Sequence, residues 1–143
     1  MRRVLVIDDE ADVRLLYRVN LRHAGFEVLE ADDGNRGIEA ALEHQPDVVV
    51  LDLMMPGADG FEVLRVLRAH PDAEDVPVLV LTADARSEDH RRCFQLGADE
   101  VITKPFVPEA LTDGVSKVLD SSLADRIARR SRGAEVTNDA AFS

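Results

Sequence analysis

The chain has 143 residues, of which 45% are hydrophobic and 31% charged, and its formal net charge is −11. These values are typical of one globular domain with a substantial core. The acidic excess argues against direct binding of nucleic acid or anionic lipid, because proteins bind phosphate groups with Lys and Arg. The lone cysteine, Cys93, excludes an internal disulfide.

Short apolar segments alternate with amphipathic segments along the first 120 residues. The apolar segments are typical of buried parallel strands, and they cover residues 4–7, 26–29, 48–51, 76–81 and 101–103. The amphipathic segments, which predict helices, cover residues 11–24, 34–44, 61–70, 87–96 and 108–119. In the first of them we expect Val13, Leu16, Tyr17, Leu21 and Ala24 to face inward. Strict strand–helix alternation predicts an α/β fold, a parallel sheet with helices on both faces.

Residues 121–143 differ from the rest, because they carry four arginines and three acidic residues. Leu123 and Ile127 could lie on one side of a short helix, but nothing extends this apolar pattern. We therefore expect residues 121–143 to form a weakly ordered polar tail or linker. Its removal should leave folding nearly unchanged.

Asp52 follows the third apolar segment directly, and Pro56-Gly57 ends that run a few residues later. An unpaired carboxylate in the middle of a buried strand would cost several kcal/mol. At the carboxyl end of the strand the cost disappears, and open α/β sheets bind their ligands at that edge. On this evidence alone, Asp52 is equally compatible with a cap of the following turn.

Three other predicted strands also end in polar residues: Asp8-Asp9 after the first, Thr82 after the fourth and Lys104 after the fifth. In a parallel sheet all these ends share one edge. Two carboxylates ~4 Å apart repel by about 4 kcal/mol at an effective dielectric constant near 20, and an all-oxygen site of this kind suits Mg²⁺. Lys104 and Thr82 could bind an anion beside the metal.

A carboxylate between Mg²⁺ and an ammonium group is a plausible phosphoryl acceptor, because aspartyl-phosphates are an established covalent form. Each residue also has a structural alternative. Asp8-Asp9 could cap the following helix, Thr82 could simply end a strand, and Lys104 could be a surface residue. Their conjunction at four strand ends favours the functional interpretation.

These residues resemble the receiver domain of two-component response regulators, in order and with the spacing of that family, over residues 3–120. The matching motifs are Val4–Glu10, Leu51–Gly57 with Asp59-Gly60, Leu81-Thr82-Ala83, Gly97-Ala98-Asp99 and Lys104-Pro105-Phe106. The resemblance implies a flavodoxin-like, doubly wound (βα)5 domain over residues 1–120, with a five-stranded sheet in the order 2-1-3-4-5.

The resemblance also implies the metal site. Asp9 and Asp52 would bind Mg²⁺ together with the backbone carbonyl of Met54, and Asp8 would contribute through water. Asp52 would be the phosphoacceptor.

The remaining implied roles concern the phosphoryl group. Lys104 would pair with it, Thr82 and Ala83 would contact it, and the Lys104-Pro105 bond would be cis. Val101 stands where the family often has an aromatic residue that swings inward. We therefore expect the switch to depend mainly on Thr82, with Val101 contributing little because it is small and stiff.

We expect a receiver that accepts a phosphoryl group from a histidine kinase or phosphotransfer protein and switches a downstream protein through its helix 4–strand 5–helix 5 face. Its catalysis would be Mg²⁺-dependent autophosphorylation and autodephosphorylation.

The chain could alternatively be the N-terminal receiver of a longer DNA-binding regulator. An aspartyl-phosphate hydrolase is disfavoured because Met54 stands where its general acid would be, and a phosphorylation-independent docking module is disfavoured because every chemical residue is present.

The predicted location is the cytoplasm. The N-terminal apolar run of residues 4–7 is too short for a signal peptide, and no run approaches the ~18 residues that a membrane span needs.

Overall fold

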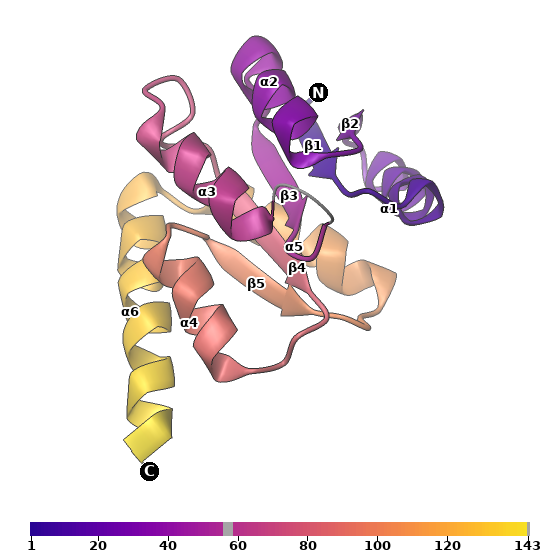
Figure 1. Ribbon diagram of the computed structural model, residues 1–143. Coiled ribbons are helices and arrows are strands. Elements are labelled where there is room, and N and C mark those ends of the chain that lie inside the picture. Colours follow the sequence, from indigo (N-terminus) through magenta and orange to yellow (C-terminus); the bar gives the residue numbers. More distant parts are fainter. Residues whose placement is uncertain (56–58, 143) are drawn as a thin grey trace.

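A single parallel sheet with the strand order β2-β1-β3-β4-β5 organises the computed structural model, which describes residues 1–55 and 59–142 (Figure 1). The strands are β1 Arg3–Ile7, β2 Glu27–Ala31, β3 Val48–Asp52, β4 Val78–Thr82 and β5 Glu100–Thr103. The helices are α1 Ala11–His23, α2 Gly34–His44, α3 Gly60–Ala69, α4 Ser87–Gln95, α5 Pro108–Asp120 and α6 Leu123–Phe142. The predicted flavodoxin-like topology is confirmed. Pro56 and Gly57, predicted to end the third strand run, lie outside the described residues.

The core lies on both faces of the sheet. Helices α2, α3 and α4 cover one face and pack against alternate residues of the central strands, such as Leu5, Val49 and Val80. Helices α1 and α5 cover the other face and pack against the residues between them, such as Val6 and Val50. Because these strands are buried on both sides, they read as continuous apolar runs. Each fully buried side chain of this kind contributes about 1.5–3 kcal/mol to folding.

Helix α1 buries a narrower stripe than its sequence predicts. Tyr17 and Leu21 are buried, and Val13 is partly buried, but Leu16 is 55% exposed and Ala24 is exposed as well. The expectation that Leu16 and Ala24 face inward is therefore wrong. Tyr17 and Leu21 lie one helical turn apart and form the buried stripe of α1. Leu16 lies at the exposed edge of this stripe. Gly25 follows the helix with a φ of 98°, as expected for a glycine at a helix end.

The tail is not weakly ordered, because residues 123–142 form α6, which runs alongside α4 (Figure 1). The prediction for this segment is wrong for a physical reason. Helix α6 docks mainly through charged side chains: Arg126 is only 6% exposed, whereas Leu123 and Ile127 are 38% and 50% exposed. The inward-facing arginines, Arg126 and Arg130, donate hydrogen bonds to the buried carboxylate of Asp99. No helix among the described residues is long and apolar enough to cross a membrane.

Candidate functional site

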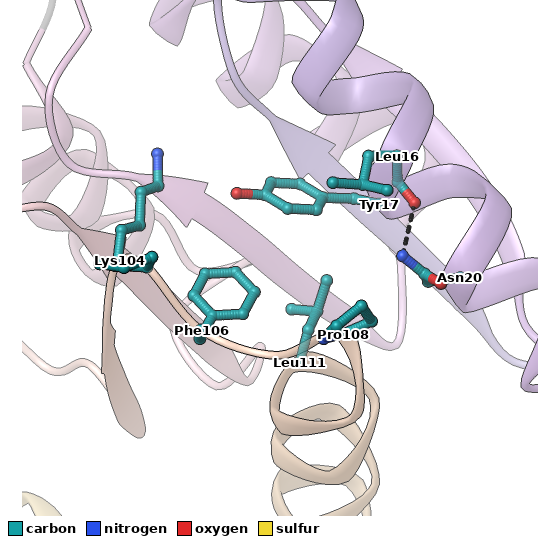
Figure 2. A pocket seen from close by; sticks show the side chains of 8 residues that line it. Leu16, Tyr17, Asn20, Lys104, Phe106, Pro108 and Leu111 are labelled. Atoms are coloured by element: carbon teal, nitrogen blue, oxygen red, sulfur yellow. Dashed lines mark hydrogen bonds between the residues drawn. The ribbon is translucent and has the colours of Figure 1, made fainter.

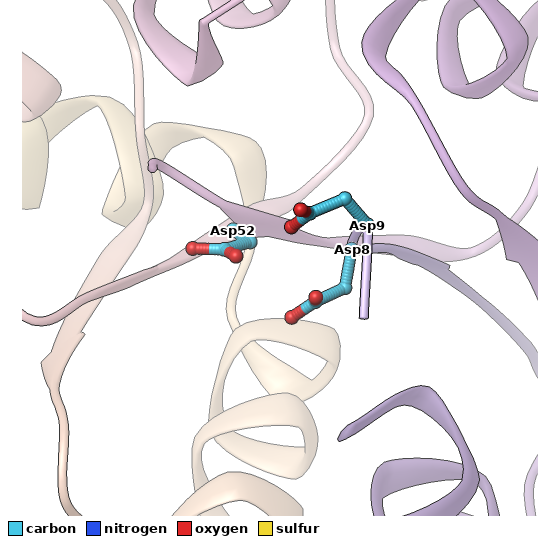
Figure 3. A group of neighbouring side chains, drawn as sticks. All are labelled: Asp8, Asp9 and Asp52. Atoms are coloured by element: carbon cyan, nitrogen blue, oxygen red, sulfur yellow. The ribbon is translucent and has the colours of Figure 1, made fainter. Parts of the chain in front are cut away.

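Three carboxylates meet at the carboxyl edge of the sheet. Residues Ile7 and Leu51 are paired across β1 and β3, so Asp8 and Asp52, which follow them, lie side by side at the carboxyl edge of the sheet. Asp9 is the next residue along the chain. One carboxylate oxygen from each of the three acids lies within 4.8 Å of the others, and Figure 3 shows the side chains gathered at this edge. Asp8 and Asp52 are buried, whereas Asp9 is exposed.

The Asp8 carboxylate is held in an unfavourable environment. Its Oδ1 accepts a hydrogen bond of 2.9 Å from the Glu10 amide, but its Oδ2 is buried with no hydrogen-bond partner among the described residues. Burial raises the pKa of Asp8 to about 6, and the negative charge of Asp52 acts in the same direction. A buried oxygen of this kind, beside other carboxylates, suits a cation ligand.

Lys104 brings a positive charge to the cluster from the end of β5. Its Nζ lies 3.4 Å from Asp52 Oδ1 and 4.0 Å from Asp8 Oδ2. The Lys104 amide donates a 2.7 Å hydrogen bond to the Thr82 carbonyl, which fixes the backbone beside β4. The Lys104-Pro105 bond is cis, as predicted. One ammonium group does not neutralise three carboxylates. The cluster therefore carries a net negative charge, which favours binding of a divalent cation.

Thr82 is the last residue of β4 and is completely buried. Its hydroxyl oxygen accepts a 3.0 Å hydrogen bond from the Asp84 amide in the segment that leads to α4. Ala83, which precedes Asp84, is exposed. Thr82 is thus already engaged with the β4–α4 segment, and any movement of its hydroxyl would release that contact.

The other two predicted site residues have limited described contacts. The Met54 amide donates to Asp52 Oδ1 over 3.1 Å, and the Met54 side chain is 65% exposed. Val101 is partly buried and packs on the face covered by α2, α3 and α4. Met54 therefore belongs to the immediate surroundings of Asp52, whereas Val101 lies within the packing of the sheet.

Sequence reasoning missed the aromatic groove beside Lys104. Tyr17 of α1 and Phe106 stack with ring centroids 5.9 Å apart, and both line a groove of about 240 Å³ (Figure 2). Burial raises the pKa of Tyr17 to about 12, with the charges of Asp8 and Asp52 adding to the effect. The sequence did contain a signal for an exposed apolar surface here. Helix α1 has more large apolar residues than one buried face can hold, and three of them are about half exposed: Leu15, Leu16 and Val19.

A family model for the response regulator receiver domain matches residues 4–116. The master transcriptional regulator RpaA from Synechocystis is 40% identical over 96% of this chain and 56% of its own length. The transcriptional regulatory protein PrrA from Mycobacterium bovis is 43% identical over 82% of this chain and 49% of its own length. The chain thus spans about half the length of these curated relatives.

Solved structures agree with the sequence comparison. The chemotaxis protein CheY4 from Vibrio cholerae superposes with a TM-score of 0.79 at 32% identity, covering 82% of this chain and 98% of that protein. A protein from Chloroflexus aurantiacus that is named as a putative response regulator superposes with a TM-score of 0.80 at 31% identity, covering 84% of this chain and 98% of that protein. The family-model match, the sheet order and these superpositions agree, and the chain belongs to the response regulator receiver domain family.

Proposed function

We propose that Asp52 accepts a phosphoryl group from a histidine kinase or phosphotransfer protein, and that the modified domain presents an altered β4–α4 region to a partner. The observation that carries this proposal is the pairing of Lys104 Nζ with Asp52 at 3.4 Å inside a cluster of three carboxylates. Such a pair offers a nucleophile and a fixed positive charge at the place where phosphoryl oxygens would arrive.

In the proposed transfer, an Asp52 carboxylate oxygen attacks the phosphorus atom of a phosphohistidine. The P–N bond of the donor breaks, its electron pair leaves on the imidazole nitrogen, and an acyl phosphate forms on Asp52. The contacts described for this carboxylate, from Met54 and Lys104, fall on Oδ1. We therefore assign the attack to Oδ2, with Lys104 neutralising the phosphoryl oxygens.

Receiver domains generally bind Mg²⁺ at an acidic cluster, and the residues present here fit that ion. We propose that Asp9, Asp52 and the Met54 carbonyl hold it directly and that Asp8 does so through water. The buried Oδ2 of Asp8, which has no hydrogen-bond partner among the described residues, supports this assignment. When bound, Mg²⁺ would offset the repulsion among the carboxylates and the charge on the incoming phosphate.

The switch residues are part of the same proposal. A phosphoryl group on Asp52 would draw the Thr82 hydroxyl away from the Asp84 amide, which now donates to it over 3.0 Å. Residues 83–87 and the start of α4 would then move with Thr82. Val101 has too little side chain to drive such a change by burial.

Receiver domains interact with histidine kinases or phosphotransfer proteins and with downstream partners. We propose that the phosphodonor docks against the exposed apolar residues of α1, Leu15, Leu16 and Val19, next to the groove that Lys104 helps to line. The downstream partner would bind the α4–β5–α5 face. Part of α4 is already covered by α6, which a partner must accommodate or displace.

Incubation with acetyl phosphate and Mg²⁺, followed by intact-mass measurement, tests the proposal. The wild-type chain should gain one phosphoryl group, and Asp52→Asn should gain none. Asp32→Asn is the matched control, because Asp32 directly follows β2 at the same edge of the sheet but pairs with Arg36. Equal labelling of Asp52→Asn and wild type would remove Asp52 from its proposed role.

A second proposal is that this receiver works within a longer DNA-binding regulator. It rests on RpaA, which is named as a DNA-binding regulator and aligns with 96% of this chain. An antibody raised against the 143 residues should then detect a product near twice this size in the source cells. A product of the size of this chain would contradict the proposal.

A further inference from the structure

We infer that α6 is an internal regulator of the Asp52 site, docked on α4 in the unphosphorylated protein and released when Asp52 is phosphorylated. The inference rests on the proposed function, because it needs a phosphoryl group at Asp52 to move the β4–α4 segment. It concerns a part of the chain outside the matched residues 4–116.

The first anchor of α6 is a fixed point at the amino edge of the sheet. Asp99 immediately precedes β5, is completely buried and accepts a 2.8 Å hydrogen bond from the Val78 amide at the start of β4. Arg126 donates to Asp99 Oδ2 over 3.1 Å and to the Asp75 carbonyl over 2.7 Å. Arg130, one turn later, donates to Asp99 Oδ1 over 2.8 Å. These charge-assisted bonds tie the first half of α6 to the strands.

The second anchor is α4 itself. A Cβ atom built on Gly133 would lie 2.5 Å from the Phe94 ring, so a larger residue at this position would force the Phe94 side chain to move. Packing this close tolerates little relative displacement, because protein interiors are dense and transmit strain. Docked α6 therefore contacts both the amino edge of the sheet and α4. Its docking requires α4 to hold one position relative to the sheet.

A chain of contacts connects α4 to the proposed phosphorylation site. The Asp84 amide donates to Thr82 Oγ1 over 3.0 Å. The Nε2 atom of His90, in α4, lies 3.2 Å from the Asp84 carbonyl oxygen and 3.1 Å from Thr103 Oγ1. Phe94 lies one turn beyond His90. If Thr82 turns toward a phosphoryl group, the Asp84 amide loses the hydroxyl oxygen to which it donates. Helix α4 is then free to shift, and a shift disrupts the packing of Phe94 against Gly133.

Release of α6 should amount to unfolding it. The helix has 20 residues and contains Gly133, and isolated helices of this length and composition are marginal in water. Docking and phosphorylation are then linked equilibria, and the linkage is reciprocal: whatever undocks α6 must also favour the phosphorylated arrangement. Both directions can be measured.

Amide hydrogen exchange of the 143-residue chain with Mg²⁺, with and without beryllofluoride, tests the forward direction. Residues 123–135 should exchange about 10-fold faster with the phosphoryl mimic, and Asp52→Asn should abolish the difference. Protection around Asp52 without any change in residues 123–135 would overturn the inference and leave the proposed function intact. No response around Asp52 at saturating beryllofluoride would overturn the proposed function, and the inference with it.

Variants that undock α6 test the reverse direction. Arg126→Ala removes ion pairing and Gly133→Val blocks the approach to Phe94, so each should bind beryllofluoride about 5-fold more tightly or better. Arg132→Ala is the matched control, because Arg132 is exposed on the same helix. Because the two undocking variants act differently, a folding defect in one leaves the other as the test. Unchanged affinity in a variant whose residues 123–135 exchange rapidly would overturn the coupling.

Discussion

At the carboxyl edge of the sheet, the described residues set three carboxylates against one ammonium group, whereas at the amino edge they set one carboxylate against three guanidinium groups. The first cluster is Asp8, Asp9 and Asp52 with Lys104. In the second, Asp99 pairs with Arg68 over 3.0 Å and with both Arg126 and Arg130 of α6. The two clusters combine carboxylates and cationic groups in opposite proportions.

The difference lies in what completes each cluster. Arg68 donates to the carbonyl oxygens of Gly97 and Val76 as well as to Asp99, so its charge is spread over many acceptors. Burial lowers the pKa of Arg68 to about 10, and the neighbouring Arg130 acts in the same direction, while Asp99 opposes it. At the amino edge, both carboxylate oxygens of Asp99 therefore accept hydrogen bonds from guanidinium groups of the described residues. At the carboxyl edge, Asp8 Oδ2 is buried and has no hydrogen-bond partner among the described residues.

The largest expected effect is at Asp99. Asp99→Ala should lower the free energy of unfolding by about 3–5 kcal/mol, because it leaves buried guanidinium groups without their shared anion. Urea denaturation followed by circular dichroism measures this loss. Asp99→Asn, which keeps an acceptor for the Val78 amide, should lose less. A loss below about 1 kcal/mol in Asp99→Ala would mean that the carbonyl acceptors alone satisfy the arginines.

Removing residues 121–143 should have the next largest effect. We expect a loss of about 2 kcal/mol, since Arg126 alone donates two hydrogen bonds of the charged type, each worth about 1.5–3 kcal/mol before compensation. Calorimetry of the shortened chain measures the change. Arg132→Ala should stay within about 0.5 kcal/mol of wild type. An unaffected shortened chain would support the sequence-based expectation of an undocked tail.

The smallest effect, and one of opposite sign, is expected at Asp9. Asp9→Asn should not destabilise the metal-free protein and should add up to about 1 kcal/mol, because it removes a like charge within 4.8 Å of Asp8 and Asp52. The rise in melting temperature on adding Mg²⁺ should shrink at the same time. A metal-free Asp9→Asn protein that melts clearly below wild type would instead identify Asp9 as a structural residue.

The sequence predicted the carboxyl-edge cluster but not the amino-edge one, and the reason is physical. Strands β1, β3 and β4 are continuous apolar runs, and topology alone brings the residues that follow them to one edge. Helix α6 docks through Arg126 and Arg130, which hydrophobic periodicity counts as solvent-facing. Their partner, Asp99, is 27 residues from Arg126, and one sequence does not reveal which distant charges pair.

The exposed position of Leu16 was missed for a related reason. Periodicity identifies apolar residues that share a helix face, but the width of the buried stripe depends on how the neighbouring elements sit. Here Phe106 stacks on Tyr17, and α5 packs against α1. Leu16 is left at the rim of the groove beside Lys104.

Asp99 is bound by Arg68 and the Val78 amide, both within residues 1–120, before any residue of α6 is considered. A receiver that has this internal pair already contains the anionic half of a docking site for a C-terminal helix. Two arginines spaced one turn apart, with a glycine shortly after them, would provide the other half. Such a helix can therefore be acquired, lost or transplanted through a few substitutions in the extension, without redesign of the domain that it fastens to.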